Sequence, residues 1–300
     1  KSISQNVFTE AFTVHPHAFM GFIPVCSCLE VLAIVAFWLD LPWIAWILAH
    51  LALPILVFEF ILYRQFLDPL FPRRQSSNVW AVIPSRGETP PTRRLIIGGH
   101  ADAAFVWTFN RWSHHLLRAV FFTIILGDIA VLITTYFPQS YFGFQSHNKL
   151  RYMVLGMHSL GLISFFFSFT TTNFFKVAPG ANDNLSGALT AIDSGRFFSG
   201  AENRLDKTEL WILISGSEEA GLRGAKAFLH DHRGALESIP QTAFIALECL
   251  RQEEHLLVVT HDLNGLRKCD TNLVGLMEKA HSAAFPHHTV PPLKREVLYC

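Results

Sequence analysis

Two adjacent carboxylates are the side chains whose position in this sequence most favours chemistry. Glu218 and Glu219 lie in the stretch GSEEAGLRG, residues 216–224, directly after the apolar run 210–214. Neighbouring side chains at the end of a strand point in different directions, so one carboxylate can bind a metal while the other holds a water. Two glutamates here would also complement the dipole of a following helix, so further motifs have to decide between the two interpretations.

A histidine and an aspartate follow another predicted strand. His100 and Asp102 occur in GGHAD, residues 98–102, and with one residue between them they lie on the same face of an extended segment. An aspartate so placed can fix the second nitrogen of a metal-binding imidazole. A surface pair or a helix cap would give the same short pattern, so HxD alone is weak evidence for a metal site.

Two more carboxylates complete the set. Asp183 lies in PGANDNLSG, residues 179–187, a glycine-flanked loop that opens a predicted helix. There it either caps the helix or bridges two metal ions. Glu248 follows the apolar run 243–247 and is either a turn residue or an oxygen ligand of the kind that zinc accepts.

Together these motifs resemble metallopeptidase family 28, the zinc aminopeptidases and glutamate carboxypeptidase-like enzymes. Members carry an HxD, a GAxDNxSG, a GEE-type strand end and a later Asp or Glu, in this order. The specific part of the match is GANDNLSG followed by GSEEAGLRGAKAF. The similarity covers about 78–112 and 174–300.

The resemblance implies a site for two zinc ions. His100 and Glu248 would bind one zinc, and Glu219 would bind the other. Asp183 would bridge the two ions. Two zinc ions would polarise a scissile carbonyl and activate a water at neutral pH.

The resemblance also implies the reaction. Asp102 would orient His100, and Glu218 would be the general base. The protein would then be a membrane-bound, zinc-dependent exopeptidase of the aminopeptidase type, which hydrolyses peptide N-terminal amide bonds through a zinc-activated water.

One ligand of the family pattern is missing. Members normally have a last histidine near the C-terminus that completes the Glu219 metal position. His281, His287 and His288 lie in or just after a predicted helix, and His261 is a poorer fit in order. We expect the missing ligand beyond Cys300 or absent. If it is absent, the protein would be mononuclear or inactive.

Strands alternating with helices must position these residues. Apolar runs predict strands at 79–83, 95–98, 210–214, 243–247, 256–259 and 297–299, and helical periodicity predicts helices at 185–198, 220–230 and 272–284. This alternation predicts an α/β sandwich with a mostly parallel sheet, and the family resemblance implies that the sandwich has three layers. Ligands of such sheets bind at the carboxyl ends of the strands, where the motifs fall.

The composition predicts a membrane protein. Half of the residues (50%) are hydrophobic, only 16% are charged, and the mean hydropathy is +0.29. The excess lies in four blocks at 18–39, 42–63, 119–137 and 152–175, each long enough to cross a bilayer. So few charges in four such runs favour two membrane hairpins over a buried soluble core.

The domain plan follows from these blocks. We expect an N-terminal membrane hairpin at 1–77 and a zinc-peptidase-like α/β domain at 78–300, which an inserted hairpin at 113–172 interrupts. That insertion would hold the site close to the bilayer. Lys and Arg collect at the span ends beside the polar segments, which predicts that the zinc domain of this multi-pass protein is cytoplasmic.

Each predicted span contains at least one ionisable side chain. They mark either an ion path or polar gate, or hydrogen bonds that hold the bundle together. The residues are Glu30, His50, Glu59, Asp128 and His158.

The net charge argues against a nucleic-acid-binding protein, and the cysteine spacing argues against a disulfide-rich one. The formal net charge is zero and no basic stripe occurs, so we expect a peptide substrate and the lipid bilayer as partners and no nucleic acid. The five cysteines form neither a disulfide framework nor a CxxC site, which indicates reduced thiols. A first residue other than Met and a last residue within an apolar run suggest a fragment at both ends. The oligomeric state stays open.

Three other functions remain open. The domain could be a catalytically inactive, hydrolase-like membrane scaffold. It could be a mononuclear-zinc cyclase or amidase on the same fold. The four spans could also conduct or transport, with the hydrolase domain regulatory. The sequence does not fix the side-chain preference, nor whether the substrate is a peptide or an amide-linked lipid or metabolite.

Overall fold

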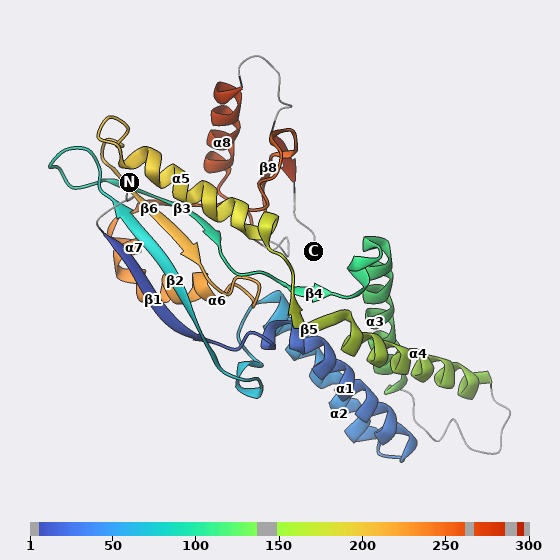
Figure 1. Cartoon of the computed structure of the whole chain (residues 1–300). Helices are drawn as coiled ribbons and strands as arrows, with labels where there is room; N and C mark the ends of the chain where they lie inside the picture. Colours follow the sequence, from blue (N-terminus) through green and yellow to red (C-terminus); the bar gives the residue numbers. More distant parts are fainter. Residues whose placement is uncertain (1–5, 137–148, 262–266, 286–292, 297–300) are drawn as a thin grey trace.

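The computed structural model describes residues 6–136, 149–261, 267–285 and 293–296. A five-stranded sheet flanked by helices forms one part, and four long helices extend from one end of it (Figure 1). The α/β class predicted from the sequence is confirmed.

The main sheet is mixed. Its strands are, in spatial order, β1 (Val7–Val14), β2 (Arg74–Ile83), β6 (Thr208–Ser215), β3 (Arg93–His100) and β7 (Gln241–Ala246). β3 pairs in parallel with β6 and β7, whereas β2 is antiparallel to both β6 and β1.

The expectation of a mostly parallel sheet is therefore wrong for the half that contains β1 and β2. Residues 84–92 connect β2 to β3, and this segment is shorter than the crossover of a dozen or more residues that parallel neighbours need. The chain therefore reverses between the two strands, and β6 lies between them. Residues 7–14 supply the edge strand β1, which the sequence analysis did not predict.

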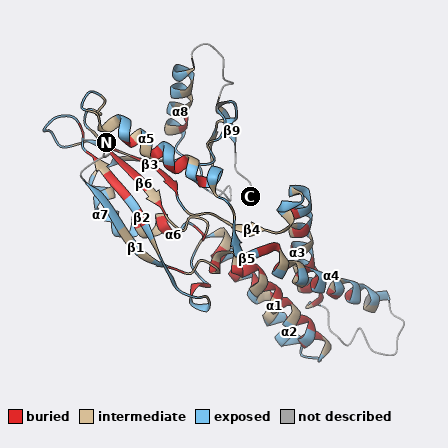
Figure 2. Ribbon diagram, viewed as in Figure 1, coloured by how far each residue is buried: buried red, intermediate tan, exposed pale blue. Residues whose placement is uncertain are grey.

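The central strands are buried because helices cover both of their faces (Figure 2). On one face, Trp80, Ile96 and Trp211 pack with Phe228 of α6 (Arg223–Asp231). On the other face, Ile97 belongs to the cluster that contains Ala191 of α5 (Gly187–Ser199). Ile96 and Ile97 are adjacent, so their opposite orientations are the alternation of a strand.

The helices of this part are α5 (Gly187–Ser199), α6 (Arg223–Asp231), α7 (Arg233–Ser238) and α8 (Thr271–Ala284). The predicted strand at 256–259 is β8 (Leu257–Val259), but it pairs in parallel with β9 (Lys294–Glu296) in a separate sheet. The predicted strand at 297–299 lies outside the described residues.

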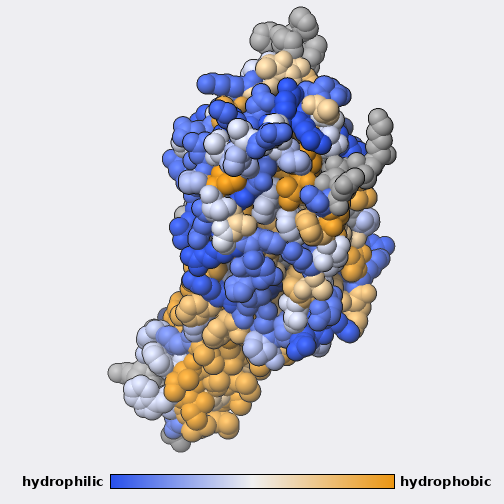
Figure 3. Space-filling model, turned by 90° about the vertical axis from the view of Figure 1, so that its left-hand side faces the viewer, coloured by the Kyte–Doolittle hydropathy of each residue, from blue (hydrophilic) through white to orange (hydrophobic). Residues whose placement is uncertain are grey.

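Four helices are long and apolar enough to cross a membrane. They are α1 (Ala18–Trp38), α2 (Pro42–Ile55) with its π-helical continuation η1 (Leu56–Ile61), α3 (His114–Thr134) and α4 (Lys149–Thr171). Large apolar side chains are exposed on them, with Trp43 at 78% and Phe122 at 67%. The space-filling view shows hydrophobic residues gathered at the end of the molecule that the long helices form (Figure 3). Such a surface fits lipid, because monomeric soluble proteins rarely expose large contiguous apolar patches.

α1 packs against α2, and α3 packs against α4, while α1 also contacts α4. Small residues permit close approach, since a Cβ on Gly127 would lie 2.6 Å from the Cβ of Ser164. Polar side chains hydrogen-bond between helices: Trp38 donates to His158, and Asp128 accepts from Ser164. These contacts favour a structural role for His158 and Asp128.

A small antiparallel pair joins the two parts. It consists of β4 (Phe105–Trp107) and β5 (Thr172–Val177), which lie directly before and after the α3–α4 segment. The remaining short helical turns are η2 (Asp68–Leu70), η3 (Phe109–Arg111), η5 (Ala181–Ser186) and η6 (Glu253–His255).

Candidate metal centre

The predicted site residues gather at one edge of the sheet. His100 is the last residue of β3, and Asp102 follows it. Glu218 and Glu219 lie in the loop between β6 and α6, and Glu248 lies just after β7. Because β3, β6 and β7 are parallel, their carboxyl ends meet at the same edge. Asp183, in η5, reaches this edge from the segment that precedes α5.

The imidazole of His100 is the centre of the cluster. Its Nε2 lies 3.2 Å from Asp183 Oδ1 and 3.3 Å from Glu248 Oε2. Glu218 Oε2 lies 3.7 Å from the same nitrogen. The ring is buried, whereas the Asp183 and Glu248 side chains are 54% and 43% exposed. The site is therefore open to solvent on its carboxylate side.

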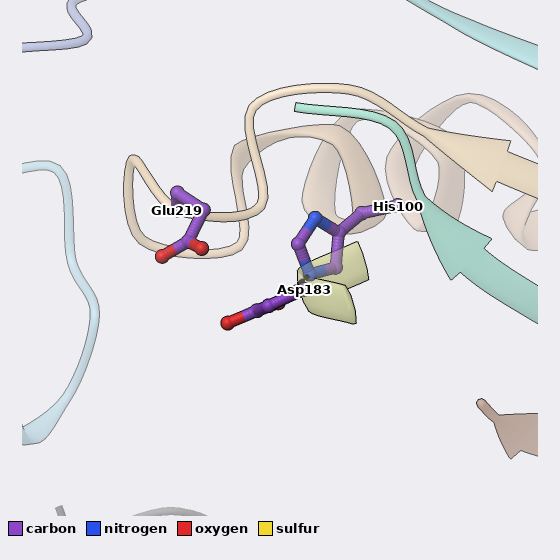
Figure 4. A group of neighbouring side chains, drawn as sticks. All are labelled: His100, Asp183 and Glu219. Carbon is purple, nitrogen blue, oxygen red and sulfur yellow. Dashed lines mark ion pairs between the residues drawn. The ribbon is translucent and has the colours of Figure 1, made fainter. Parts of the chain in front are cut away.

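His100, Asp183 and Glu219 form one candidate ligand group (Figure 4). One ligand atom from each lies within 4.8 Å of the others. Asp183 also belongs to a second group, with Glu248 and Cys249. Asp183 is thus the residue that the two groups share.

The donor set fits zinc. Zinc takes imidazole nitrogen and carboxylate oxygen at about 2.0–2.2 Å, so two ligands in tetrahedral geometry lie about 3.3 Å apart. The distances from His100 to Asp183 and Glu248 match this spacing. Several carboxylates around one imidazole repel one another, and a bound cation would offset this repulsion.

Asp102 ties the histidine to the glutamate pair. Its Oδ1 lies 3.5 Å from His100 Nδ1 and accepts a 2.9 Å hydrogen bond from the Glu218 backbone N–H. Its Oδ2 accepts from the Glu219 backbone N–H at 3.0 Å. Burial raises the pKa of Asp102, but the bonds from His100 and the two amides outweigh it, so the pKa is lowered. Asp102 therefore stays ionised and positions both motifs.

Asn184 is a site residue that the sequence analysis missed. Its side chain is buried and donates to the Leu247 carbonyl at 2.8 Å, while its Oδ1 accepts from the Gly187 and Cys249 amides. These bonds join the Asp183 loop to the strand end that carries Glu248. A side chain at Gly187 would collide with the Leu247 carbonyl, so the approach requires glycine. The only signal in the sequence was the position of Asn184 beside Asp183.

Asn78 fixes the other loop and was also missed. It lies buried in β2, where its Oδ1 accepts from the Gly216 amide at 3.2 Å and its Nδ2 donates to the Gly224 carbonyl at 2.9 Å. Both ends of the stretch 216–224 are therefore held to the sheet. A polar residue inside an apolar strand is the signal that could have identified it.

Cys249 adds a thiol next to Glu248. Burial raises its pKa to about 11, and the nearby carboxylates of Asp183 and Glu248 add to the shift. A thiol with this pKa stays protonated at neutral pH, and thiolate is the form that binds metals. Cys249 would therefore have to lose a proton before it could bind a metal.

Protons compete for the same atoms. Burial raises the pKa of Glu218 and of Glu219 to about 7, and neighbouring carboxylates add to both shifts, although His100 lowers them. His100 is buried, which lowers its pKa, but hydrogen bonds to Asp102, Asp183 and Glu248 raise it further than burial lowers it. In the metal-free protein these groups therefore hold protons into the neutral range.

Zinc affinity should consequently rise with pH. A metal must displace the proton from His100 and from Glu219, and each displaced proton costs up to about tenfold in affinity per pH unit below its pKa. We expect affinity at pH 5.5 to be at least about tenfold weaker than at pH 7.5. Competition with a chromophoric chelator across this range measures it. Affinity that stays constant with pH would contradict the assignment of these ligands.

The structure does not identify the last histidine of the family pattern, which would complete the metal position of Glu219. His261 and His281 are described, yet the candidate ligand groups found among the described residues contain no histidine except His100. His287 and His288 lie outside the described residues. The position of this ligand stays a prediction.

Comparison with protein families gives one match. Residues 164–291 match peptidase family M28. The matched stretch contains Asp183, Glu218, Glu219 and Glu248, while His100 and Asp102 precede it. Comparisons with curated proteins and with solved structures find no significant match.

Proposed function

We propose that this chain, whose residues 164–291 match peptidase family M28, is a membrane-bound zinc-dependent exopeptidase of the aminopeptidase type. The match to this family supports a metallopeptidase-type hydrolase that depends on zinc. The observation that supports the site best is the convergence of Asp183 and Glu248 on one nitrogen of His100, beside the Glu218–Glu219 pair.

In this proposal the chain holds the metal from several loops at once. His100, Asp183, Glu219 and Glu248 would be ligands, and Asp183 would be shared between two positions. When bound, zinc supplies a Lewis acid for the peptide carbonyl and lowers the pKa of water toward neutrality. Asp102 keeps the imidazole and the backbone of the glutamate pair in place.

Glu218 is the proposed general base. Its carboxylate lies next to the ligand cluster, 3.7 Å from His100 Nε2, and its pKa in the metal-free protein is raised to about 7. A carboxylate in this position would take a proton from the attacking water and return it to the leaving amine. Burial of the carboxyl group is the main cause of this pKa.

The test is zinc content per chain of the purified full-length protein together with cleavage of aminoacyl-nitroanilides. We expect two zinc ions and chelator-sensitive cleavage that zinc restores. Nα-acetylated versions of the same substrates are the matched control, because an aminopeptidase needs the free amine. One zinc with cyclisation of N-terminal glutamine would favour the cyclase, and zinc-free protein without cleavage would favour the scaffold.

We also propose that the metal site faces the cytoplasm. The support is the charge asymmetry at the span ends. Six basic residues, Arg64, Arg73, Arg74, Arg111, Arg118 and Lys176, flank the polar segments, whereas the other ends have Lys149 and Arg151.

Cys269 is exposed and can report the orientation. In a variant that keeps Cys269 as its only cysteine, a membrane-impermeant maleimide should label inside-out vesicles and leave intact cells unlabelled. Labelling from outside intact cells would reverse the orientation.

A further inference from the structure

The loop that carries Glu218 and Glu219 rests on the ends of the first two apolar helices. At Gly221 the backbone has φ +92°, and a Cβ there would lie 2.7 Å from the ring of Phe19, the second residue of α1. Phe19 stacks in turn on Tyr63, with ring centroids 5.4 Å apart. Glycine is therefore needed for both the conformation and the close approach.

A buried ion-pair cluster lies next to this contact. Arg223 begins α6, and its side chain is 0% exposed. Its Nη2 donates to Glu59 Oε1 and to Asp68 Oδ1, each at 2.8 Å. Glu59 belongs to η1, at the end of the candidate span Pro42–Ile61, and its side chain is also 0% exposed.

The acidic partners are themselves fixed. Glu59 uses its second oxygen to accept a 2.8 Å hydrogen bond from the Leu67 backbone N–H. Asp68 is the first residue of η2 and is largely buried. Glu59 thus binds the segment that follows its own helix as well as Arg223, and this accounts for one of the ionisable residues in the spans.

Because the ion pairs of Arg223 are buried, the loss of either charged partner strongly destabilises the cluster. Removing one member of a buried ion pair leaves an uncompensated charge, which costs far more than the loss of an exposed pair. Within the described part of the chain, Nε and Nη1 of Arg223 make no hydrogen bond. The two ion pairs of Arg223 with Glu59 and Asp68 therefore depend on Nη2 alone.

A short hydrogen-bonded turn connects Arg223 to the loop that carries Glu218 and Glu219. The Arg223 amide donates to the Ser217 carbonyl at 3.0 Å, and the Gly221 and Leu222 amides donate to the Glu218 carbonyl at 2.9 and 2.7 Å. A displacement of Arg223 therefore moves the backbone of Glu218 and Glu219. The rest of α6 is held independently of Arg223, because Phe228 packs in the core with Trp80 and Trp211.

We propose that Glu59 and Asp68 are positioning residues of the metal centre, which act through Arg223 to hold the Glu218–Glu219 loop against the membrane end of α1 and η1. The inference rests on the proposed function of this loop. The end of the membrane helix is then a structural part of the active site, and its contribution is the placement of ligands.

The experiment compares variants of the full-length protein by zinc affinity, with the visible spectrum of the cobalt-loaded protein as a second readout. Glu59→Gln keeps an acceptor for the Leu67 amide but loses the charge that pairs with Arg223. We expect zinc affinity to fall about 10- to 100-fold, the usual effect of removing support behind metal ligands, with an altered cobalt spectrum.

Arg223→Gln should weaken zinc binding at least as much, and Arg223→Lys should restore part of it, because one nitrogen makes both contacts. If Arg223→Gln does not fold, the zinc affinities of Glu59→Gln and Arg223→Lys still test the positioning role. The matched control is Glu237→Gln, which removes a carboxylate from the exposed Arg233–Glu237 pair on α7. This control should bind zinc like the unchanged protein.

Two outcomes separate this inference from the proposed function. If unchanged protein and folded variants bind zinc equally and give the same cobalt spectrum, the positioning role is wrong, even where peptide cleavage is observed. If the variants lose zinc affinity although no form of the protein cleaves peptides, the positioning role stands and the exopeptidase assignment falls.

Discussion

Glu218→Gln is expected to lower kcat by about 10²- to 10⁴-fold while zinc content per chain stays unchanged, which is the range of a lost general base. Glutamine has the size of glutamate and keeps one oxygen, but it cannot accept a proton from water. The hydrogen bond from residue 218 to Asp102 comes from the backbone N–H, so it survives the substitution. The position of Glu219 is therefore preserved.

Measurement of kcat and zinc content on the same preparation tests this expectation. Glu237→Gln provides the matched control, because Glu237 is an exposed carboxylate whose ion pair lies on α7. It should leave kcat unchanged. Near-normal activity of Glu218→Gln would exclude Glu218 as the base, and loss of zinc would instead make it a ligand.

The convergence of the candidate residues was predictable because most of their signals are local. His100, the Glu218–Glu219 pair and Glu248 each follow a short apolar run, and the carboxyl ends of neighbouring parallel strands meet. Asp183 instead lies in the loop that opens a helix. His100, Asp183 and Glu248 come together although 148 positions separate the first from the last. The alternation of apolar runs with acidic strand ends, together with the family resemblance, led to the expectation that these residues converge.

The supporting contacts were not predictable in the same way. Glu59 and Arg223 are 164 positions apart, and neither residue carries a periodic or motif signal that names its partner. An intramembrane glutamate favoured an interhelical hydrogen bond over an ion path, and neither interpretation names a partner in the polar domain. Its contact with the polar domain depends on how α2 and η1 meet the loop at 216–223, which is a tertiary property.

The expectation of a mostly parallel sheet was wrong at β2 for a related reason. Apolar runs predict that a strand exists, but pairing direction depends on the connections and on the strand that inserts between neighbours. β6 pairs with β2 on one side and β3 on the other, although it follows both in sequence by more than a hundred residues. β1 was missed because its partner β2 begins only after both apolar helices.

Asp183→Ala is expected to remove zinc from both positions and to reduce activity at least about 100-fold, since even the support behind a metal ligand contributes 10- to 100-fold. Asp183 is the carboxylate that both candidate ligand groups share. Glu219 belongs to one group only, so Glu219→Ala should release one ion and retain the other. The comparison of these two variants therefore measures bridging directly.

The number of zinc ions per chain, determined after dialysis against a weak chelator, shows whether Asp183 binds two metal positions, one or none. The Asp183 side chain is 54% exposed, so its loss leaves no large cavity and the fold should persist. Asp193→Ala is the matched control, because Asp193 is an exposed aspartate on α5 paired with Arg196. If Asp183→Ala loses a single ion, Asp183 binds one position only. If it retains all of the zinc, the shared-ligand geometry at the end of β3 does not hold the metal, and His100 with Glu248 has to account for it.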